Sequence, residues 1–442
     1  MNKKNGILYS SGGIGSSLLI SVFASFLVFF YVDHLKMPAD WIGIAMLVYG
    51  IWNAVNDPLF GHISDKTRTK HGRRKPYILW GTVPLVVVFA LVWTPPFNVL
   101  TTVAWRMVYF FLIIAIFDTL YTIVILNWSA LFPEMFKTQK ERTDISAVRL
   151  VFSIIGNILG VALPPLLYTT IGWQMMGIVF GVIGLISLAL SYIGSKEDPT
   201  YSEGESLPMG KALVETFKNR SFVIYVAAAF FLQLTFVLIQ GGIPFYCKYV
   251  LQIPEGFQVS LVLGMIFISA MVFALMWTRL INKHGSKKIF IIAIGMFALA
   301  LIPYWFIHGL MGGIIAGIFL GVGLSALMIL LEVMISDVID EDELKTGTRR
   351  EGMYYGVNGF VVRIAIAIES LLLGYILKLS GYDANIAANA QPASAVVGIK
   401  SLVTLVPFVA CVIVFLIISR YPLYGERLEN LKEKMHAKHS LR

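Results

Sequence analysis

Long runs of apolar residues constrain the fold of this chain more than any other feature of its sequence. A helix that crosses the hydrocarbon core of a bilayer needs about 20 mostly apolar residues. Twelve stretches meet this requirement, and they cover residues 8–32, 41–63, 77–98, 105–132, 146–170, 174–194, 221–250, 258–282, 287–308, 312–337, 352–380 and 398–420. Only 14% of the residues are charged, against about 25% in a typical soluble domain. We therefore predict an all-α membrane protein with twelve transmembrane helices in a lipid bilayer.

The twelve predicted helices divide into two sets of six. The longest polar stretch between them, residues 195–220, contains proline, glycine and charges of both signs. Two short basic loops also repeat, since residues 70–75 read KHGRRK and residues 283–288, which start 213 positions later, read KHGSKK. Such a repeat at about half the chain length indicates duplicated halves. We predict an N-terminal six-helix bundle over 1–195, a cytoplasmic loop over 196–220, and a C-terminal bundle with a cytoplasmic tail over 221–442.

Lysines and arginines lie mainly on one side of the predicted membrane. Of the 35, 28 fall in the N-terminal segment, the loops after the even-numbered helices and the C-terminal tail. Positively charged loops stay in the cytoplasm, so we expect a multi-pass protein of the cell (inner) membrane with both termini in the cytoplasm. Membrane orientation accounts for the net charge of +9, and we expect no nucleic-acid partner.

Motifs of enzymes and metal sites are missing from the sequence. It contains neither Gly-x-Ser-x-Gly nor His-Glu-x-x-His, which are typical of hydrolases and zinc peptidases. The two cysteines, Cys247 and Cys411, lie in apolar runs, and the seven histidines have no zinc spacing. We predict that the chain is not an enzyme and holds no cofactor. We expect it to bind no metal ion other than Na⁺, in the role of coupling ion.

Two polar segments interrupt the apolar runs. Residues 53–61 read NAVNDPLFG and place an Asp-Pro pair inside a predicted span, and residues 337–340 and 349–356 read DVID and RREGMYYG. Together with residues 121–133 and 141–149, these segments resemble the glycoside–pentoside–hexuronide:cation symporter family of the major facilitator superfamily. The resemblance covers nearly the whole chain. It implies the major facilitator fold, with two pseudo-symmetric six-helix bundles around a central cavity.

A carboxylate in the second predicted helix is the first candidate for cation binding. Asp57 costs several kcal/mol inside a span unless it is paired, protonated or bound to a metal ion. The following Pro58 lacks an N–H and leaves carbonyl groups free to ligate. The resemblance implies that Asp57, Asn53 and Thr122 bind the coupling cation, H⁺ or Na⁺. Because the family usually has a second aspartate at the position of Asn53, its absence here favours a proton.

Two of these assignments have alternatives. Asp57 alternatively forms a structural salt bridge with an arginine. Asp118 lies one turn before Thr122 on the same face of the fourth predicted helix. It either replaces the carboxylate missing at Asn53, pairs with Arg106, or lies near the outer interface, where a solvated acid is unremarkable.

Two arginines from different halves are the candidate solute ligands. The resemblance implies that Arg149 lies near the sugar site and that Arg363 lines the cavity. Two guanidinium groups facing one cavity would suit an anionic sugar such as a uronide. Alternatively, each arginine neutralises an embedded acid, Asp57 for Arg149 and Glu332 or Glu369 for Arg363, and Arg149 equally fits a structural or gating role.

Three further side chains are expected at the solute site, namely Trp128, Ser17 and Asn358. Trp128 would stack on a sugar ring, although tryptophan in a span commonly packs or anchors at the interface. In galactoside carriers of the family, aspartates occupy the positions of Ser17 and Ile125. Their replacement here argues against a galactoside.

Charged loop residues are predicted to form a cytoplasmic gate that holds the halves together when the cavity faces outward. Alternatively they are solvated charges that contribute about 0–1 kcal/mol per pair. The residues are Asp65, Arg68, Arg73, Arg74, Asp337, Asp340, Arg349 and Arg350.

The function expected from these features is cation-coupled transport of a sugar, glycoside or uronide by alternating access, with the protein a monomer by family analogy. Three alternatives stay open at this point: the same fold carrying a lysolipid or another amphiphile, a uniporter, and a membrane scaffold or sensor that transports nothing. The sequence leaves the solute, the coupling ion and the direction of flux undetermined.

Overall fold

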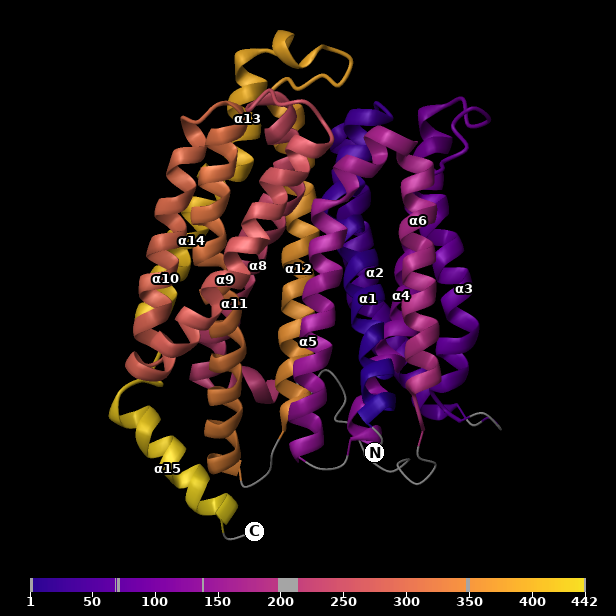
Figure 1. Cartoon of the computed structure of the whole chain (residues 1–442). Coiled ribbons are helices and arrows are strands. Elements are labelled where there is room, and N and C mark those ends of the chain that lie inside the picture. Colours follow the sequence, from indigo (N-terminus) through magenta and orange to yellow (C-terminus); the bar gives the residue numbers. More distant parts are fainter. Residues whose placement is uncertain are drawn as a thin grey trace.

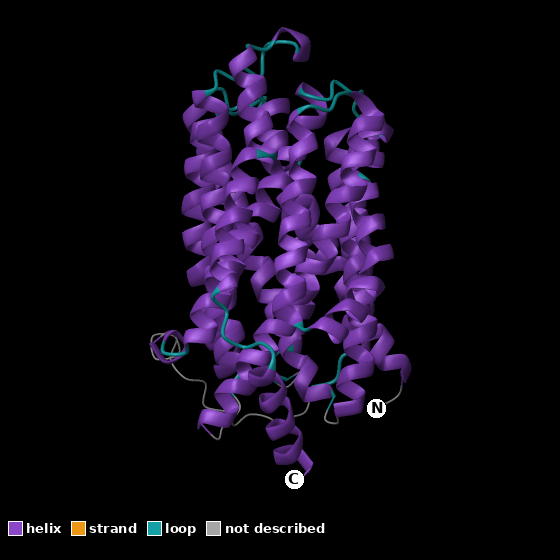
Figure 2. Ribbon diagram, turned by 90° about the vertical axis from the view of Figure 1, so that its left-hand side faces the viewer, coloured by secondary structure: helices purple, strands orange, loops and turns teal. Residues whose placement is uncertain are grey.

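The computed structural model describes residues 3–67, 69, 72–136, 139–197, 214–346 and 350–440. Within these residues the chain consists of helices and connecting loops without strands (Figure 2). The long helices run side by side, and both termini lie at the same end of the molecule (Figure 1). We call this end the terminal face and the other end the opposite face. The prediction of an all-α protein is confirmed.

The first half of the chain supplies six of the long helices. α1 (Lys3–Phe29) continues as the π-helical turn η1 (Phe30–His34). It is followed by α2 (Ala39–Lys66), α3 (Lys75–Val92), α4 (Val103–Met135), α5 (Gln139–Ala162) and α6 (Pro164–Gly194). α1 packs against α5 and α6, α3 packs against α4 and α6, and α2 packs against α4.

The second half is built in a similar way and carries a helical tail. Its elements are α8 (Arg220–Tyr249), α9 (Phe257–His284), α10 (Ser286–Leu301), η2 (Ile302–Trp305), α11 (Gly309–Thr346), α12 (Glu351–Leu379), η3 (Ala388–Ala390), α13 (Ala393–Val403), α14 (Leu405–Ser419) and α15 (Glu426–Ser440). α8 packs against α12, α13 and α14, while α9 and α10 pack against α11. The polar tail helix α15 contacts α11 at the terminal face (Figure 1).

Eleven helical segments of the described chain are long and apolar enough to cross a membrane, with α13 and α14 counted as one. α2 is 28 residues long but carries Asn53, Asn56 and Asp57 near its middle. It occupies the place of the predicted second span and packs between α4 and α12. Together with α2, the described residues contain the twelve long helices that the hydropathy pattern predicts.

Local backbone signals explain where α6 begins and where it is interrupted. α6 begins at the Pro164–Pro165 pair, because proline needs no intrahelical donor in the first turn. It is then interrupted at Gly172, whose φ of 82° and ψ of 162° are not helical. The segment after this break matches the predicted sixth span. The predicted loop at 196–220 lies largely outside the described residues, so the division of the chain at that loop stays a prediction.

Small residues allow α2 of the first half to approach α12 of the second half closely. A Cβ atom added to Gly50 would lie 2.2 Å from Cβ of Ala367, and one added to Gly374 would lie 2.4 Å from the carbonyl oxygen of Ala39. Close approach of this kind is how membrane helices gain packing energy, since lipid supplies little hydrophobic driving force between them. The α2–α12 contact therefore joins the two halves.

We predict that Gly50→Ala weakens this contact and lowers the melting temperature of the purified protein in detergent. The added methyl group has no room against Ala367, and overpacking of this kind costs about 1–3 kcal/mol. Gly359→Ala on α12 is the matched control, because nothing lies within 4 Å of its added Cβ. Equal melting temperatures for the two variants would contradict the assignment.

Candidate functional site

A large cavity lies between the two halves of the molecule. Its volume is about 1430 Å³, and its walls come from α1, α2, α4 and α5 of the first half and from α8, α11 and α12 of the second. Apolar atoms make up most of the surface of the cavity wall. The charged and polar lining side chains are Tyr49, Asn53, Asp118, Tyr121, Thr122, Ser129, Ser146, Arg149, Ser153, Glu332, Tyr355, Arg363, Glu369 and Ser370.

Exposure of the lining side chains differs between the two ends of the cavity. Leu27 and Val28, near the opposite face, are buried. Ser146 and Tyr355 line the cavity from the first turns of α5 and α12 at the terminal face, and both are exposed, Tyr355 at 43%. The cavity is therefore accessible from the terminal face.

Asp118 occupies the centre of a polar cluster on the first-half wall. It is 2% exposed, and its carboxylate accepts hydrogen bonds from Tyr49 Oη at 3.2 Å, from Asn56 Nδ2 at 3.0 Å and from Asn53 Nδ2. Arg106 instead donates to the carbonyl oxygens of residues 97 and 100. These hydrogen bonds offset part of the cost of burying a carboxyl group in the cavity wall.

The structure describes the side chains of three of the four residues predicted to bind the cation. Asn53, Thr122 and Asp118 all line the same stretch of the cavity. Asp57 lies on α2, one turn after Asn53, and its side chain is outside the described residues. Asn56 joins the cluster through its bond to Asp118, and the sequence pattern alone gave it no role.

Arg149 and Trp128 form one structural unit on the same wall. The guanidinium carbon of Arg149 lies 4.1 Å from the centroid of the Trp128 ring, and its Nη2 donates to Ser129 Oγ at 2.9 Å. Trp128 is buried, and its indole N–H donates to the carbonyl oxygen of Tyr9 at 3.2 Å. It is not among the lining residues, so Arg149 presents the cation and Trp128 supports it through a cation–π contact.

Arg363 and two acids line the second-half wall. The Glu332 carboxylate accepts from Tyr355 Oη at 3.4 Å and the Glu369 carboxylate accepts from Ser370 Oγ at 2.8 Å. Within the described part of the chain, neither acid is paired with Arg363. The alternative that one of them neutralises this arginine therefore does not describe this conformation.

Two of the expected solute ligands lie away from the cavity lining. Ser17 faces the contact between α1 and α5, where a Cβ added to Gly156 would lie 3.0 Å from its own Cβ. Asn358 is half-buried on α12, and its Oδ1 has no hydrogen-bond donor among the described residues. Neither residue is part of the cavity wall in this conformation.

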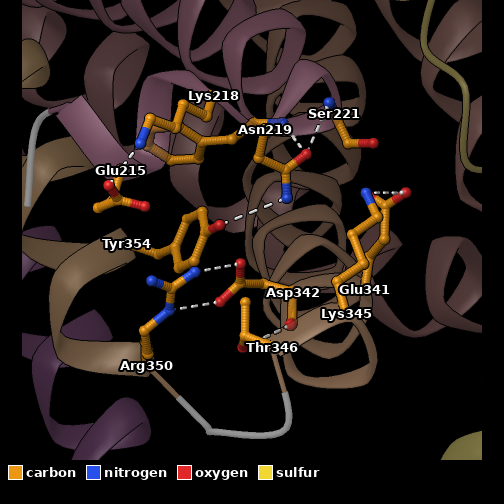
Figure 3. Close-up of polar contacts among 11 residues, drawn as sticks. Glu215, Lys218, Asn219, Ser221, Glu341, Asp342, Lys345, Thr346, Arg350 and Tyr354 are labelled. Atoms are coloured by element: carbon orange, nitrogen blue, oxygen red, sulfur yellow. Dashed lines mark hydrogen bonds and ion pairs between the residues drawn. The ribbon is translucent and has the colours of Figure 1, made fainter.

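Three ion pairs that the structure describes at the terminal face each connect groups within one half. Glu134 accepts from Arg73 Nη2 at 2.7 Å and from Arg74 Nε at 3.0 Å, all in the first half. In the second half Arg350 Nη2 lies 2.6 Å from Asp342 Oδ1, as Figure 3 shows.

The other residues of the predicted gate take no part in these pairs. Asp337 is buried near Ser286, and Asp340 is half-buried on α11. The side chains of Asp65, Arg68 and Arg349 lie outside the described residues. The predicted gate concerns a state in which this face is closed, and it stays a prediction.

A different set of contacts joins the halves at the opposite face. Asp33 of η1 is buried and accepts from Lys248 Nζ at 2.6 Å, from Tyr382 Oη at 2.7 Å and from Tyr249 Oη, all in the second half. Lys378 Nζ also lies 2.5 Å from Asp40 Oδ2. We call the contacts of Asp33 and Asp40 the outer seam. The sequence contained one signal for it, an acid directly after an apolar run.

We predict that Asp33→Asn loosens the outer seam, because an amide removes the charge that Lys248 and the two tyrosine hydroxyl groups bind. Removing one partner of a buried ion pair costs about 3–5 kcal/mol, and 1.4 kcal/mol already corresponds to about tenfold. Labelling of the buried native Cys247 by a thiol reagent supplied at the opposite face should accelerate at least about tenfold, in a Cys411→Ala background. Asp383→Asn, in the adjoining loop and without a contact to Asp33 or Lys248 among the described hydrogen bonds, is the control, and equal labelling rates would refute the role of Asp33.

Comparisons with known proteins identify the class of this chain. The profile of the MFS/sugar transport protein family matches residues 8–425. The chain therefore belongs to this family, the glycoside–pentoside–hexuronide symporter family of the major facilitator superfamily, and it is a multi-pass membrane protein.

Relatives agree over almost the full length. The chain is 26% identical to the putative glycoside/cation symporter YagG of Escherichia coli, over 98% of this chain and 95% of that protein. It is 25% identical to the isoprimeverose transporter of Lactiplantibacillus pentosus, over 88% of this chain and 82% of that protein. The crystal structure of a D-xylose–proton symporter superposes with a TM-score of 0.69 at 13% identity, over 95% and 97% of the two chains. The predicted major facilitator fold is confirmed, and the family points to transport, not to enzymatic catalysis.

Proposed function

We propose that the protein is a cation-coupled symporter of a sugar, a glycoside or a uronide that works by alternating access. The observation that carries this proposal is the central cavity of about 1430 Å³, which is accessible from one face and closed at the other by the outer seam. A cavity between two helical bundles is where carriers of this fold bind solute. The names of the relatives, a glycoside/cation symporter and an isoprimeverose transporter, support a carbohydrate as the cargo.

The charges of the cavity support separate binding sites for the cation and for the solute. On the first-half wall, the carboxylate of Asp118 with the amides Asn53 and Asn56 offers an anionic site for H⁺ or Na⁺. Arg149 and Arg363 add positive charge from the two walls. Guanidinium groups bind hydroxyl groups and, more strongly, carboxylates, so a uronide is the preferred solute class.

Orientation of the molecule follows from the charge distribution. If the lysine- and arginine-rich terminal face is cytoplasmic, the present conformation is inward-facing. The carrier then rocks to the outward-facing state when the outer seam opens and the predicted gate at Asp337, Asp340, Arg73, Arg74 and Arg350 closes. By analogy with the family, we propose that the protein works as a monomer.

A transport assay tests the proposal directly. Proteoliposomes containing the wild-type protein should accumulate at least one solute from a panel of glycosides and uronides when an H⁺ or Na⁺ gradient is imposed. Without a gradient, uptake should stop at equilibration. Gradient-independent uptake would identify a uniporter, lysolipid uptake alone would identify a lipid carrier, and the absence of any uptake would favour a scaffold.

We predict that Asp118→Asn reduces gradient-driven accumulation at least about tenfold. The amide preserves the size of the side chain but removes the negative charge that attracts the cation, which is worth several kcal/mol in this environment. Asp57→Asn is expected to act in the same way. Asp144→Asn, at an exposed acid on α5, is the control and should leave uptake unchanged. Full accumulation by Asp118→Asn would exclude this acid from cation coupling.

A further inference from the structure

A second buried carboxylate faces the cavity from the half that does not carry the predicted cation site. Glu369 lies on α12, within the apolar span 353–379, and is 6% exposed. It lines the cavity together with its neighbour Ser370. The turns of α12 on both sides of Glu369, from Ala367 to Gly374, form the close α2–α12 contact, where a Cβ added to Gly43 would lie 3.1 Å from the carbonyl oxygen of Ser370. Glu369 thus lies on the part of α12 that both lines the cavity and contacts the first half.

The polar partners of Glu369 are too few to stabilise a negative charge. Its Oε2 accepts from Ser370 Oγ at 2.8 Å, and no cation of the described residues lies within ion-pair distance. Arg363 is six residues earlier, which places it about 9 Å away along the helix axis and about 120° around it. An isolated carboxylate buried in this way costs several kcal/mol, so the neutral acid is the favoured form.

Asp118, on the facing wall of the same cavity, has more hydrogen-bond donors around its carboxyl group than Glu369 has. Its carboxylate receives hydrogen bonds from a tyrosine and two asparagines, whereas Glu369 has the single donor Ser370. Several donors favour the anion, and one hydroxyl group does not offset its desolvation. The two acids are therefore suited to opposite charge states.

Among the described residues, no charged side chain forms an ion pair with the Glu369 carboxyl group. On α8, a Cβ added to Gly241 would lie 2.9 Å from Oε1 of Glu369, so the carboxyl group fills the space that the missing side chain leaves. The titratable and charged side chains that share the cavity wall are Tyr49 of α2, Asp118 and Tyr121 of α4, Arg149 of α5, Glu332 of α11, and Tyr355 and Arg363 of α12. Lys400 of α13, which packs on α12, donates to the carbonyl oxygen of Trp305.

We propose that Glu369 carries the coupling proton on the second half of the protein, and that its alternating burial and hydration transfer one proton per transport cycle. The idea rests on the proposed symport, names its ion as H⁺, and assigns the protonation step to Glu369, with Asp118 as the negative charge that attracts the proton to the cavity. The present inward-facing conformation holds the acid buried and protonated. When cavity water reaches Glu369, the proton passes from its oxygen to that water, and the O–H electron pair stays on the carboxylate. After the α2–α12 contact has opened and hydrated the carboxylate from the opposite face, closing the contact buries it again, and it takes a proton from water on that side.

The first test measures coupling in proteoliposomes with radiolabelled methyl β-D-glucuronide and methyl β-D-xyloside as probes. Glu369→Gln mimics the neutral acid, so it should still exchange solute across the membrane without a gradient. Accumulation driven by a pH gradient should fall at least about tenfold, and Glu369→Asp should restore part of it because it keeps the carboxyl group. Full proton-driven accumulation by Glu369→Gln, loss of its exchange activity, or wild-type accumulation driven by Na⁺ alone would each overturn the proposal.

The second test needs no solute and therefore separates this proposal from the proposed function. Infrared difference spectra between the wild-type protein and Glu369→Gln at neutral pH should contain the C=O band of a protonated carboxylic acid. The difference spectrum for Glu332→Gln, whose acid is exposed, should contain a carboxylate band instead. A carboxylate band for Glu369 would overturn the proposal, whereas absent sugar uptake together with the protonated band would refute only the proposed cargo.

Discussion

The free energy of burying a charge in a low-dielectric interior is the constraint on which the arrangement of this protein depends. Three buried carboxylates receive three kinds of compensation. Glu134 is bound by two arginines of its own half, Asp118 accepts hydrogen bonds from a tyrosine and two asparagines of its own half, and Asp33 is bound by a lysine and two tyrosines of the other half. A buried ion that loses its partners is strongly destabilising. Compensation from the other half therefore ties the halves together, and compensation from the same half leaves them free to separate.

The conformation of the molecule follows from where each kind of compensation lies. The ties of Asp33 and Asp40 to the second half lie at the opposite face, where α2 and α12 also pack closely. At the terminal face, the ion pairs of Glu134 and Asp342 stay within one half each. Contacts between the halves close the cavity at the opposite face, and ion pairs within each half leave it accessible from the terminal face. In alternating access, the contacts between the halves form at one face and break at the other. A bound solute changes the relative populations of these two states.

The cavity itself combines charges that act on different cargo. The proposed cation site lies around Asp118, and the cationic groups Arg149 and Arg363 face the same space from both halves. Because an anionic solute and a cation neutralise these opposite charges together, the loaded cavity is less costly to close than the empty one. Glu369 adds a carboxyl group whose surroundings favour the neutral form, on the helix that packs closely against α2.

The sequence by itself determined the number and kind of helices, because hydropathy over about 20 residues is a local and additive property. It also determined that Asn53, Thr122, Asp118, Arg149 and Arg363 are polar residues inside spans, and all five line the cavity. Only the tertiary structure decided that Trp128 turns toward Tyr9, that Ser17 faces α5, and that Asp33 binds the second half. Helices that are apolar on every side give no signal of which face packs inward. Rotation and register about each axis are therefore set by contacts between helices far apart in the chain.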